Sequence, residues 1–137
     1  SFFNSGCNRK TKKLKVFGAD WDTKDGSGVR DYIHIIDLVK GHLASINYLN
    51  SKDSCLEFIN LGSGKGYSVF QIIHQFEIST GRNIPFSIEC RRDGDVAKCY
   101  ADISKAKKLL GWYPKRSLEQ ICLDGWNWQM KNPNGYS

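Results

Sequence analysis

The chain has 137 residues, of which 40% are hydrophobic and 25% charged, and its formal net charge is +6. This length and composition are those of a single globular domain with one modest core. No apolar run is long enough to span a bilayer and no signal peptide is visible, so we expect no membrane association. The positive net charge suits an anionic ligand, and nucleic acid is one candidate for such a ligand.

Five cysteines are scattered along the chain without a CxxC pair. This odd, irregular set argues against a zinc ribbon or a disulfide framework. The three histidines also have no ligand partners at metal-site spacing, so we predict structural histidines and no metal site. We therefore expect a reducing compartment, the cytoplasm. Because the chain starts with serine, we also expect a fragment of a longer protein.

The first 13 residues carry four cations and little hydrophobic pattern. This favours a solvated, frayed segment over residues 1–13, with a nucleic-acid-binding arm as the second interpretation. The pattern then predicts a short strand over residues 14–17. Phe17 is either a core residue or an aromatic face on which a flat base stacks, and the residues alone favour the core.

A glycine turn, an arginine and an apolar run come next. Gly26 and Gly28 give the backbone freedom for a tight turn, and Arg30 follows where this loop meets an ordered element. The guanidinium of Arg30 suits bidentate binding of a phosphate or a carboxylate. It could equally pair with Asp31 or Asp37 and only lock the turn, and the residues alone leave both interpretations open.

Apolar residues recur at helical spacing after this turn and predict a helix that packs one face on the core and ends near residue 50. The residues of this face are Ile35, Val39, Leu43 and Ile46. The mostly apolar run 56–61 then predicts a buried parallel strand.

The remaining chain alternates helix and strand signals. Ser68 with Gln71, and Ser117 with Gln120, form capping boxes that predict the starts of two helices. A strand over residues 86–90 and a further short helix are predicted between them. Strands that alternate with helices favour an α/β fold with parallel pairing.

A glycine loop over residues 62–66 separates the predicted strand 56–61 from the next helix. In many proteins a helix N-terminus behind such a loop binds phosphates. Its spacing fits neither the dinucleotide fingerprint nor the P-loop, so we interpret it as structural and keep dinucleotide binding as a minor hypothesis. Tyr48 and Lys52 formally match the YxxxK of short-chain dehydrogenases. With six tyrosines and fourteen lysines, a chance match is expected in roughly one of two such chains, and we treat this one as coincidental.

Residues 91–95, with the sequence RRDGD, place two arginines beside two aspartates after a strand. A surface turn with self-paired charges is the simpler interpretation of these residues alone. Alternatively, an arginine grips a diphosphate while a carboxylate accepts hydrogen bonds from ribose hydroxyls.

Four blocks of sequence carry a resemblance to a known family. They are VFGADWDTKDGSGVRDYIH (16–34), NLGSGKGYS (60–68), RRDGDV with YAD (91–96 and 100–102), and WNWQ with NPNGY (126–129 and 132–136). They resemble the UDP-glucose 4-epimerases, extended short-chain dehydrogenases/reductases that commonly read VFGxDYxTxDGTGVRDYIHVxDLAxGH in the first block. The resemblance covers nearly the whole chain but only the C-terminal part of such an enzyme.

The resemblance implies a small α/β C-terminal substrate-binding domain that lacks the N-terminal Rossmann half, with residues 14–137 as the UDP-sugar-binding portion. In the family, tightly held NAD takes hydride from C4 of the sugar and returns it to the other face, which interconverts UDP-glucose and UDP-galactose in galactose metabolism. The catalytic groups and the NAD site have no counterpart in this chain. We therefore expect it to be inactive alone and to belong to a cytoplasmic homodimeric enzyme.

The resemblance also assigns substrate-binding residues. Lys15, Val16 and Phe17 match the segment along the uracil, and Arg30 and Arg92 match diphosphate contacts. Asp95 matches a ribose contact, and Cys99 matches a gate of the sugar pocket.

The gate bears on specificity. In the family, a tyrosine at this position crowds the substituent at C2 of the hexose, whereas a small residue admits an N-acetyl group. Cys99 therefore predicts that the enzyme also accepts UDP-N-acetylglucosamine and UDP-N-acetylgalactosamine.

The alternative from another class is a basic nucleic-acid-binding α/β module. Such a module needs clustered surface cations and stacking aromatic residues. The cations of this chain are instead spread along its length, so we expect a UDP-sugar ligand and no nucleic acid.

Overall fold

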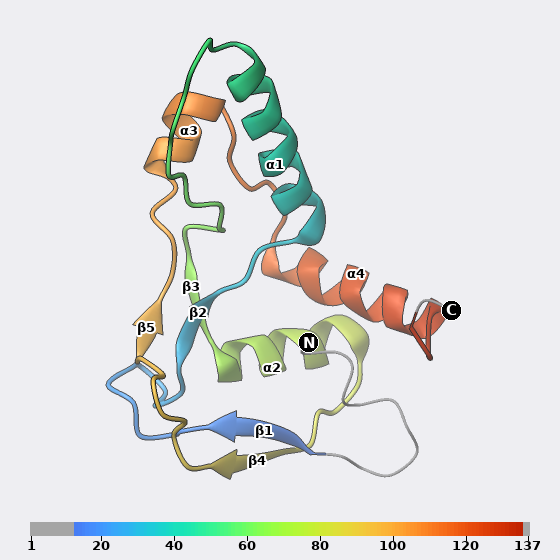
Figure 1. Cartoon of the computed structure of the whole chain (residues 1–137). Coiled ribbons are helices and arrows are strands. Elements are labelled where there is room, and N and C mark those ends of the chain that lie inside the picture. The colour runs from blue at the N-terminus through green and yellow to red at the C-terminus, as the bar shows by residue number, and fades with distance from the viewer. Residues whose placement is uncertain (1–12, 136–137) are drawn as a thin grey trace.

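A computed structural model describes residues 13–135. The elements in chain order are β1 (Leu14–Phe17), β2 (Val29–Asp31), α1 (Ile35–Asn50), β3 (Gly66–Ser68), α2 (Val69–Thr80), β4 (Phe86–Glu89), β5 (Lys98–Cys99), α3 (Ser104–Leu110) and α4 (Leu118–Lys131). Figure 1 shows an elongated arrangement, with α1 and α3 side by side at one end and the β1–β4 pair at the other. The segment expected to be frayed, residues 1–13, lies outside the described residues except for Lys13.

Two small sheets organise the strands. β1 pairs in parallel with β4, while β2 lies between β3 and β5 in a three-stranded sheet. β2 is parallel to β5 but antiparallel to β3, so the predicted parallel pairing is confirmed for two of the three pairs. The α/β class is confirmed, and β2 brings the chain around Arg30 beside the chain around Cys99.

Both predicted capping boxes are present. Ser68 Oγ accepts a hydrogen bond from the N–H of Gln71 at 3.1 Å, and the Gln71 side chain accepts one from the N–H of Ser68 at 2.9 Å. Ser117 and Gln120 repeat this arrangement at the start of α4. These bonds satisfy N–H groups that a helix start leaves without an intrahelical partner.

The apolar core lies mainly where α2 packs on α4. The ring of Phe76 meets the edge of Trp126 at 5.8 Å between centroids, which is a favourable aromatic geometry. The buried hydrophobic residues are Val16, Ile72, Ile73, Phe76, Ala106, Trp112 and Cys122. Burial also raises the pKa of the Cys122 thiol to about 11.

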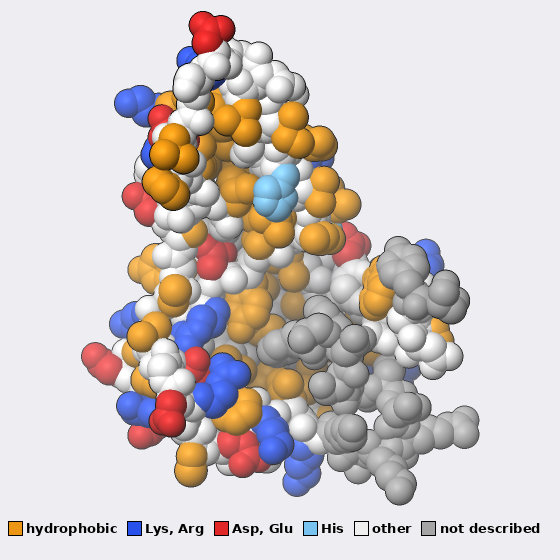
Figure 2. All heavy atoms as spheres, in the orientation of Figure 1, with side chains coloured by type: hydrophobic (Ala, Val, Ile, Leu, Met, Phe, Trp, Pro, Cys, Tyr) orange, Lys and Arg blue, Asp and Glu red, His pale blue; other side chains and the backbone are white. Residues whose placement is uncertain are grey.

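α1 forms where it was predicted, but the prediction that its apolar stripe packs on the core is wrong. The four stripe residues Ile35, Val39, Leu43 and Ile46 are 43–64% exposed. Figure 2 shows hydrophobic side chains gathered over this part of the molecule. The buried side of α1 carries Asp37 and Gly41 instead, because the connection between α3 and α4 packs there. Helical periodicity identifies an apolar face but not what covers it.

The strand predicted over residues 56–61 is also absent. This segment is irregular, and Leu56 and Phe58 are 84% and 82% exposed. A strand needs the backbone of a neighbouring strand to complete its hydrogen bonds, and residues 13–135 place none beside this segment. An apolar sequence alone therefore did not suffice to form it.

Asp37 organises the junction between α1 and the connection that precedes α4. Its Oδ2 accepts hydrogen bonds from the N–H groups of Lys115 at 3.0 Å and Arg116 at 2.8 Å, and its Oδ1 accepts one from the Arg116 guanidinium at 2.7 Å. Burial by itself would raise the pKa of Asp37, but these donors outweigh it and hold the pKa below its ordinary value of 3.8. Asp37 is thus a buried, ionised carboxylate.

The described residues contain no group of three or more His, Cys, Asp and Glu side chains that could hold a metal ion. Within the same residues, no helix is both long and apolar enough to cross a membrane.

We predict that Asp37→Asn lowers the free energy of unfolding by about 2–3 kcal/mol at neutral pH, because the amide cannot replace an ionised acceptor of three hydrogen bonds. The folded pKa lies below the unfolded one, so this stabilisation is present above pH 3.8 and is lost as the pH falls through the folded pKa. Urea unfolding of both proteins at several pH values measures it. Asp53→Asn, in the exposed loop after α1, is the matched control, and an equal loss in both variants would contradict the prediction.

Candidate functional site

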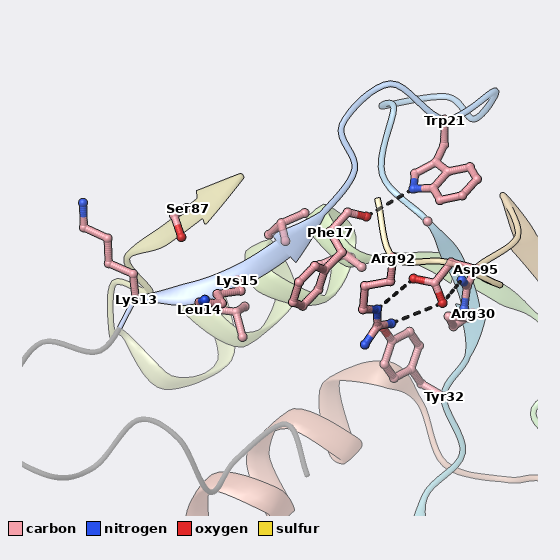
Figure 3. Close-up of a pocket in the computed structure, with 13 residues that line it drawn as sticks. Lys13, Leu14, Lys15, Phe17, Trp21, Arg30, Tyr32, Ser87, Arg92 and Asp95 are labelled. Atoms are coloured by element: carbon pink, nitrogen blue, oxygen red, sulfur yellow. Dashed lines mark hydrogen bonds and ion pairs between the residues drawn. The ribbon is translucent and has the colours of Figure 1, made fainter. Parts of the chain in front are cut away.

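A cavity of about 860 Å³ lies between β1, β2 and the turn that follows β4 (Figure 3). It brings together residues that are up to 82 positions apart in the chain, because β1 pairs with β4 and β2 pairs with β5. Six of the seven residues assigned from the sequence line it: Lys15, Val16, Phe17, Arg30, Arg92 and Asp95.

β1 forms one wall of the cavity. Val16 is 1% exposed and belongs to the core beneath the cavity, whereas Lys15 and Phe17, its neighbours along the strand, are more accessible. The Phe17 ring is half-buried and lies 4.6 Å from the guanidinium carbon of Arg92. The core position that the residues alone favoured for Phe17 is therefore wrong, and an aromatic face borders the cavity.

Two arginines converge on one carboxylate at the opposite wall. Arg92 Nε lies 2.9 Å from Asp95 Oδ2, and Arg30 Nη2 lies 3.6 Å from Asp95 Oδ1. The interpretation that Arg30 pairs with Asp31 or Asp37 is thus wrong. The hydrogen bond from Arg92, supported by both positive charges, holds the pKa of Asp95 below its ordinary value. Asp95 is a charged acceptor within reach of two guanidinium groups.

The lining of the cavity is strongly cationic. Four cations, from Lys13, Lys15, Arg30 and Arg92, face one carboxylate, that of Asp95. The guanidinium groups each have five N–H donors, and the bonds to Asp95 use only some of them. This arrangement can hold a ligand with more than one negative charge and with hydroxyl donors for Asp95.

Sequence reasoning missed several lining residues, among them Trp21, Tyr32 and Ser87. Burial raises the pKa of the Tyr32 phenol, although the nearby Arg30 charge acts in the opposite direction. All three lie within or beside the blocks that carry the family resemblance. For Tyr32, its place two residues after Arg30 was a signal that could have indicated it.

Cys99 lies outside this cavity. It sits on β5 opposite Arg30 in the strand register and lines a second, more open hollow with Asn60 and Tyr100. Arg30 is among the residues that line both spaces. A ligand that extends past Arg30 from the cavity would reach the side of the sheet on which Cys99 lies.

The glycine loop of residues 62–66 has a structural role. Asp31 Oδ1 accepts a hydrogen bond from the N–H of Ser63 at 2.7 Å, and Asp31 Oδ2 accepts one from the N–H of Gly64 at 3.3 Å. Asp31 Oδ2 also accepts a hydrogen bond from the N–H of Ala101, which ties the segment after β5 to the same carboxylate. Because these N–H groups point at an aspartate, the loop does not fit the phosphates of a dinucleotide such as NAD.

His34 and the Tyr48–Lys52 pair, which the sequence also singled out, have contacts that stabilise the fold. His34 caps α1, since its Nδ1 accepts the N–H of Ile36 at 3.1 Å, and its Nε2 therefore donates to Asp124 at 3.0 Å. Lys52 lies over the ring of Tyr48 near the end of α1, away from the cavity. The YxxxK match thus has no part in this site.

The chain with this fold belongs to a known class of protein. A family model described as GDP-mannose 4,6 dehydratase matches residues 4–124, and the chain belongs to that family. Within it, the chain is 52% identical to the UDP-glucose 4-epimerase of Yersinia enterocolitica over 93% of its own length, and 47% identical to the human enzyme. The resemblance found in the sequence is confirmed. The chain spans only about 37% of the length of these relatives.

Solved structures give the same result. The Bifidobacterium longum UDP-glucose 4-epimerase in complex with NAD⁺ and UDP matches with a TM-score of 0.86 and 48% identity, over 91% of this chain and 37% of that one. The UDP-Glc/GlcNAc 4-epimerase of Campylobacter jejuni matches with a TM-score of 0.79 and 35% identity, over 93% and 39% of the two chains. The fold is therefore part of an extended short-chain dehydrogenase/reductase.

Proposed function

We propose that residues 14–137 are the UDP-sugar-binding portion of a UDP-glucose 4-epimerase. The observation that carries this proposal is the convergence of Arg30 and Arg92 on Asp95 in one cationic cavity. Two guanidinium groups suit a diphosphate, and a charged carboxylate between them suits ribose hydroxyls. The relatives that bind UDP or carry the epimerase name support it.

In the proposed complex the uracil lies along Lys15, Val16 and Phe17, and the diphosphate replaces part of the contact between the arginines and Asp95. The sugar then extends past Arg30 toward the hollow beside Cys99. Such remote binding of the nucleotide holds the substrate while the sugar itself stays free to turn.

The other parts of the reaction need residues that this chain does not supply. When bound, NAD would accept and return the hydride, but the glycine loop that faces Asp31 does not fit it. We assign no catalytic residue here, and we propose that the complete enzyme is a cytoplasmic homodimer. The exposed stripe of α1 and the segment 56–61 would pack on the rest of the enzyme, which supplies the strand partner that 56–61 lacks.

Nucleic-acid binding is less favoured. The cations that do gather in the structure line a cavity and contact a carboxylate, whereas a nucleic-acid site presents them along an open groove. A fall of DNA affinity with rising salt, without any binding of UDP, would favour this alternative.

We predict that Arg30→Ala and Arg92→Ala each weaken UDP binding by about 1.5–3 kcal/mol, because each removes a charge-assisted contact to the diphosphate. Isothermal titration calorimetry with UDP and with uridine measures the change. Affinity for UDP should fall strongly, while affinity for uridine should change little because it lacks the phosphates.

Arg82→Ala is the matched control, since it removes the same charge beside Trp126 and outside the cavity. If UDP affinity is unchanged in both cavity variants, or falls as much in the control, the phosphate clamp is wrong.

We also predict that the 137-residue chain alone neither interconverts UDP-glucose and UDP-galactose nor retains NAD. The physical reason is that its glycine loop binds Asp31, and that the catalytic groups of the resembled family have no counterpart in its sequence. A coupled assay of the purified chain, together with the absorbance of bound nucleotide, tests this. Turnover by the chain without any other polypeptide would contradict it.

The sugar specificity follows from Cys99. Its side chain is small and exposed beside Arg30, and a larger ring at this place would fill part of the hollow. We therefore propose that the complete enzyme accepts N-acetylated as well as plain UDP-hexoses. A structural neighbour that is named a UDP-Glc/GlcNAc 4-epimerase is consistent with this range.

In the complete enzyme, Cys99→Tyr should lower kcat/KM for UDP-N-acetylglucosamine by at least about tenfold while it changes that for UDP-glucose little, because the ring excludes the N-acetyl group. Cys90→Tyr is the control, because Cys90 is also exposed but lines neither the cavity nor the hollow beside Cys99. An unchanged ratio of the two kcat/KM values would show that Cys99 does not border the sugar.

A further inference from the structure

Two consecutive arginines contact two different aromatic rings. Arg92 lies over Phe17 inside the cavity, whereas Arg91 lies outside it, with its guanidinium carbon 4.0 Å from the centroid of the Trp21 ring. Trp21 itself lines the cavity. Arg91 thus covers one face of a residue that forms part of the wall.

Arg91 also holds the loop that carries Trp21. Its Nε lies 2.8 Å from Asp20 Oδ1, and its Nη2 donates to the carbonyl oxygen of Asp20, 71 residues earlier in the chain. This ion pair is exposed, and exposed pairs contribute little by themselves. The two contacts act together, however: Trp21 packs on the plane of the guanidinium, and Asp20 accepts hydrogen bonds at its edge.

The backbone permits this close packing only because Gly18 has no side chain. A Cβ at this position would lie 2.4 Å from Trp21 Nε1 and 2.9 Å from Arg91 Cγ, and the residue has a φ of +79°. Trp21 Nε1 donates to the carbonyl oxygen of Phe17 at 3.2 Å, and the N–H of Gly18 donates to Glu89 at 2.9 Å. The indole is therefore anchored to the same short stretch on which Arg92 stacks.

We infer that Arg91 is a positioning residue of this site: by stacking on Trp21 and binding Asp20, it fixes the Trp21 wall and the placement of Arg92 over Phe17. The inference rests on the proposed function, because the ligand that the wall and Arg92 would meet is the UDP part of the substrate. The family pattern commonly has tyrosine at the position of Trp21, and the larger indole offers a guanidinium the stronger cation–π partner.

A double-mutant cycle on UDP affinity tests this inference in the 137-residue chain. Arg91→Ala should raise the Kd for UDP about two- to fivefold, which is about 0.4–1.0 kcal/mol at 1.4 kcal/mol per tenfold. In a Trp21→Leu background the same change should have a clearly smaller effect, because the stack is gone and only the contacts of Arg91 with Asp20 remain. Arg91→Lys keeps the charge but not the planar stack, and it should behave like Arg91→Ala.

Arg92→Ala is the matched comparison, since it removes a proposed direct contact and should weaken UDP binding whichever residue stands at position 21. Wild-type affinity in Arg91→Ala, or an equal loss with and without Trp21, would overturn the inference.

Hydrogen exchange provides a measurement without nucleotide. Arg91→Ala should speed exchange of the amides in residues 19–27, while the urea midpoint stays within the range of the wild type. If the wild-type chain binds no UDP and Arg91→Ala still speeds exchange in residues 19–27, the proposed function would be overturned. The role of Arg91 in holding this loop would stand. Unchanged exchange in residues 19–27 would overturn the role of Arg91.

Discussion

The contact of Arg30 and Arg92 with the single carboxylate of Asp95 is the interaction on which the site depends. Arg30 comes from β2, while Arg92 and Asp95 come from the turn after β4, so the contact joins the two sheets across the cavity. Two guanidinium groups this close would repel each other without an anion between them. The carboxylate supplies that anion in the ligand-free protein, and a diphosphate entering the cavity would add charge of the same sign.

Three aspartates near Arg30 in sequence or in space take distinct tasks. Asp95 lines the cavity, and Asp31 accepts hydrogen bonds from the glycine loop and from the segment after β5. Asp37 holds the chain that leads into α4. In the last two cases an ionised group replaces the backbone partners that irregular segments would otherwise lack. Arg30 is therefore placed by a strand whose last residue, Asp31, anchors two other segments.

Two apolar surfaces remain exposed in the described part of the chain. The stripe of α1 and the segment 56–61 have the residues of buried elements, yet they face solvent in this chain. The chain spans about 37% of the length of the relatives that it matches. An amphipathic helix keeps its conformation through internal hydrogen bonds, whereas an isolated strand loses its own, which explains why α1 forms and residues 56–61 do not.

The sequence by itself determined the features that depend on near neighbours in the chain, above all the starts of α2 and α4. The capping bonds join residues only three apart, so their signal is complete in the local sequence. Six of the residues that line the cavity were also found from the sequence, but through the likeness to a family rather than through their spacing.

Only the tertiary structure decided the partners of the charged groups and the surroundings of each apolar face. The sequence offered Asp31 and Asp37 as partners of Arg30, but Arg30 contacts Asp95, 65 positions later, because β2 lies beside β5. Trp21 and Arg91 meet across 70 residues through the pairing of β1 with β4. Contacts of this kind depend on strand register, and register is set by pairing and burial together, which a single stretch of sequence does not contain.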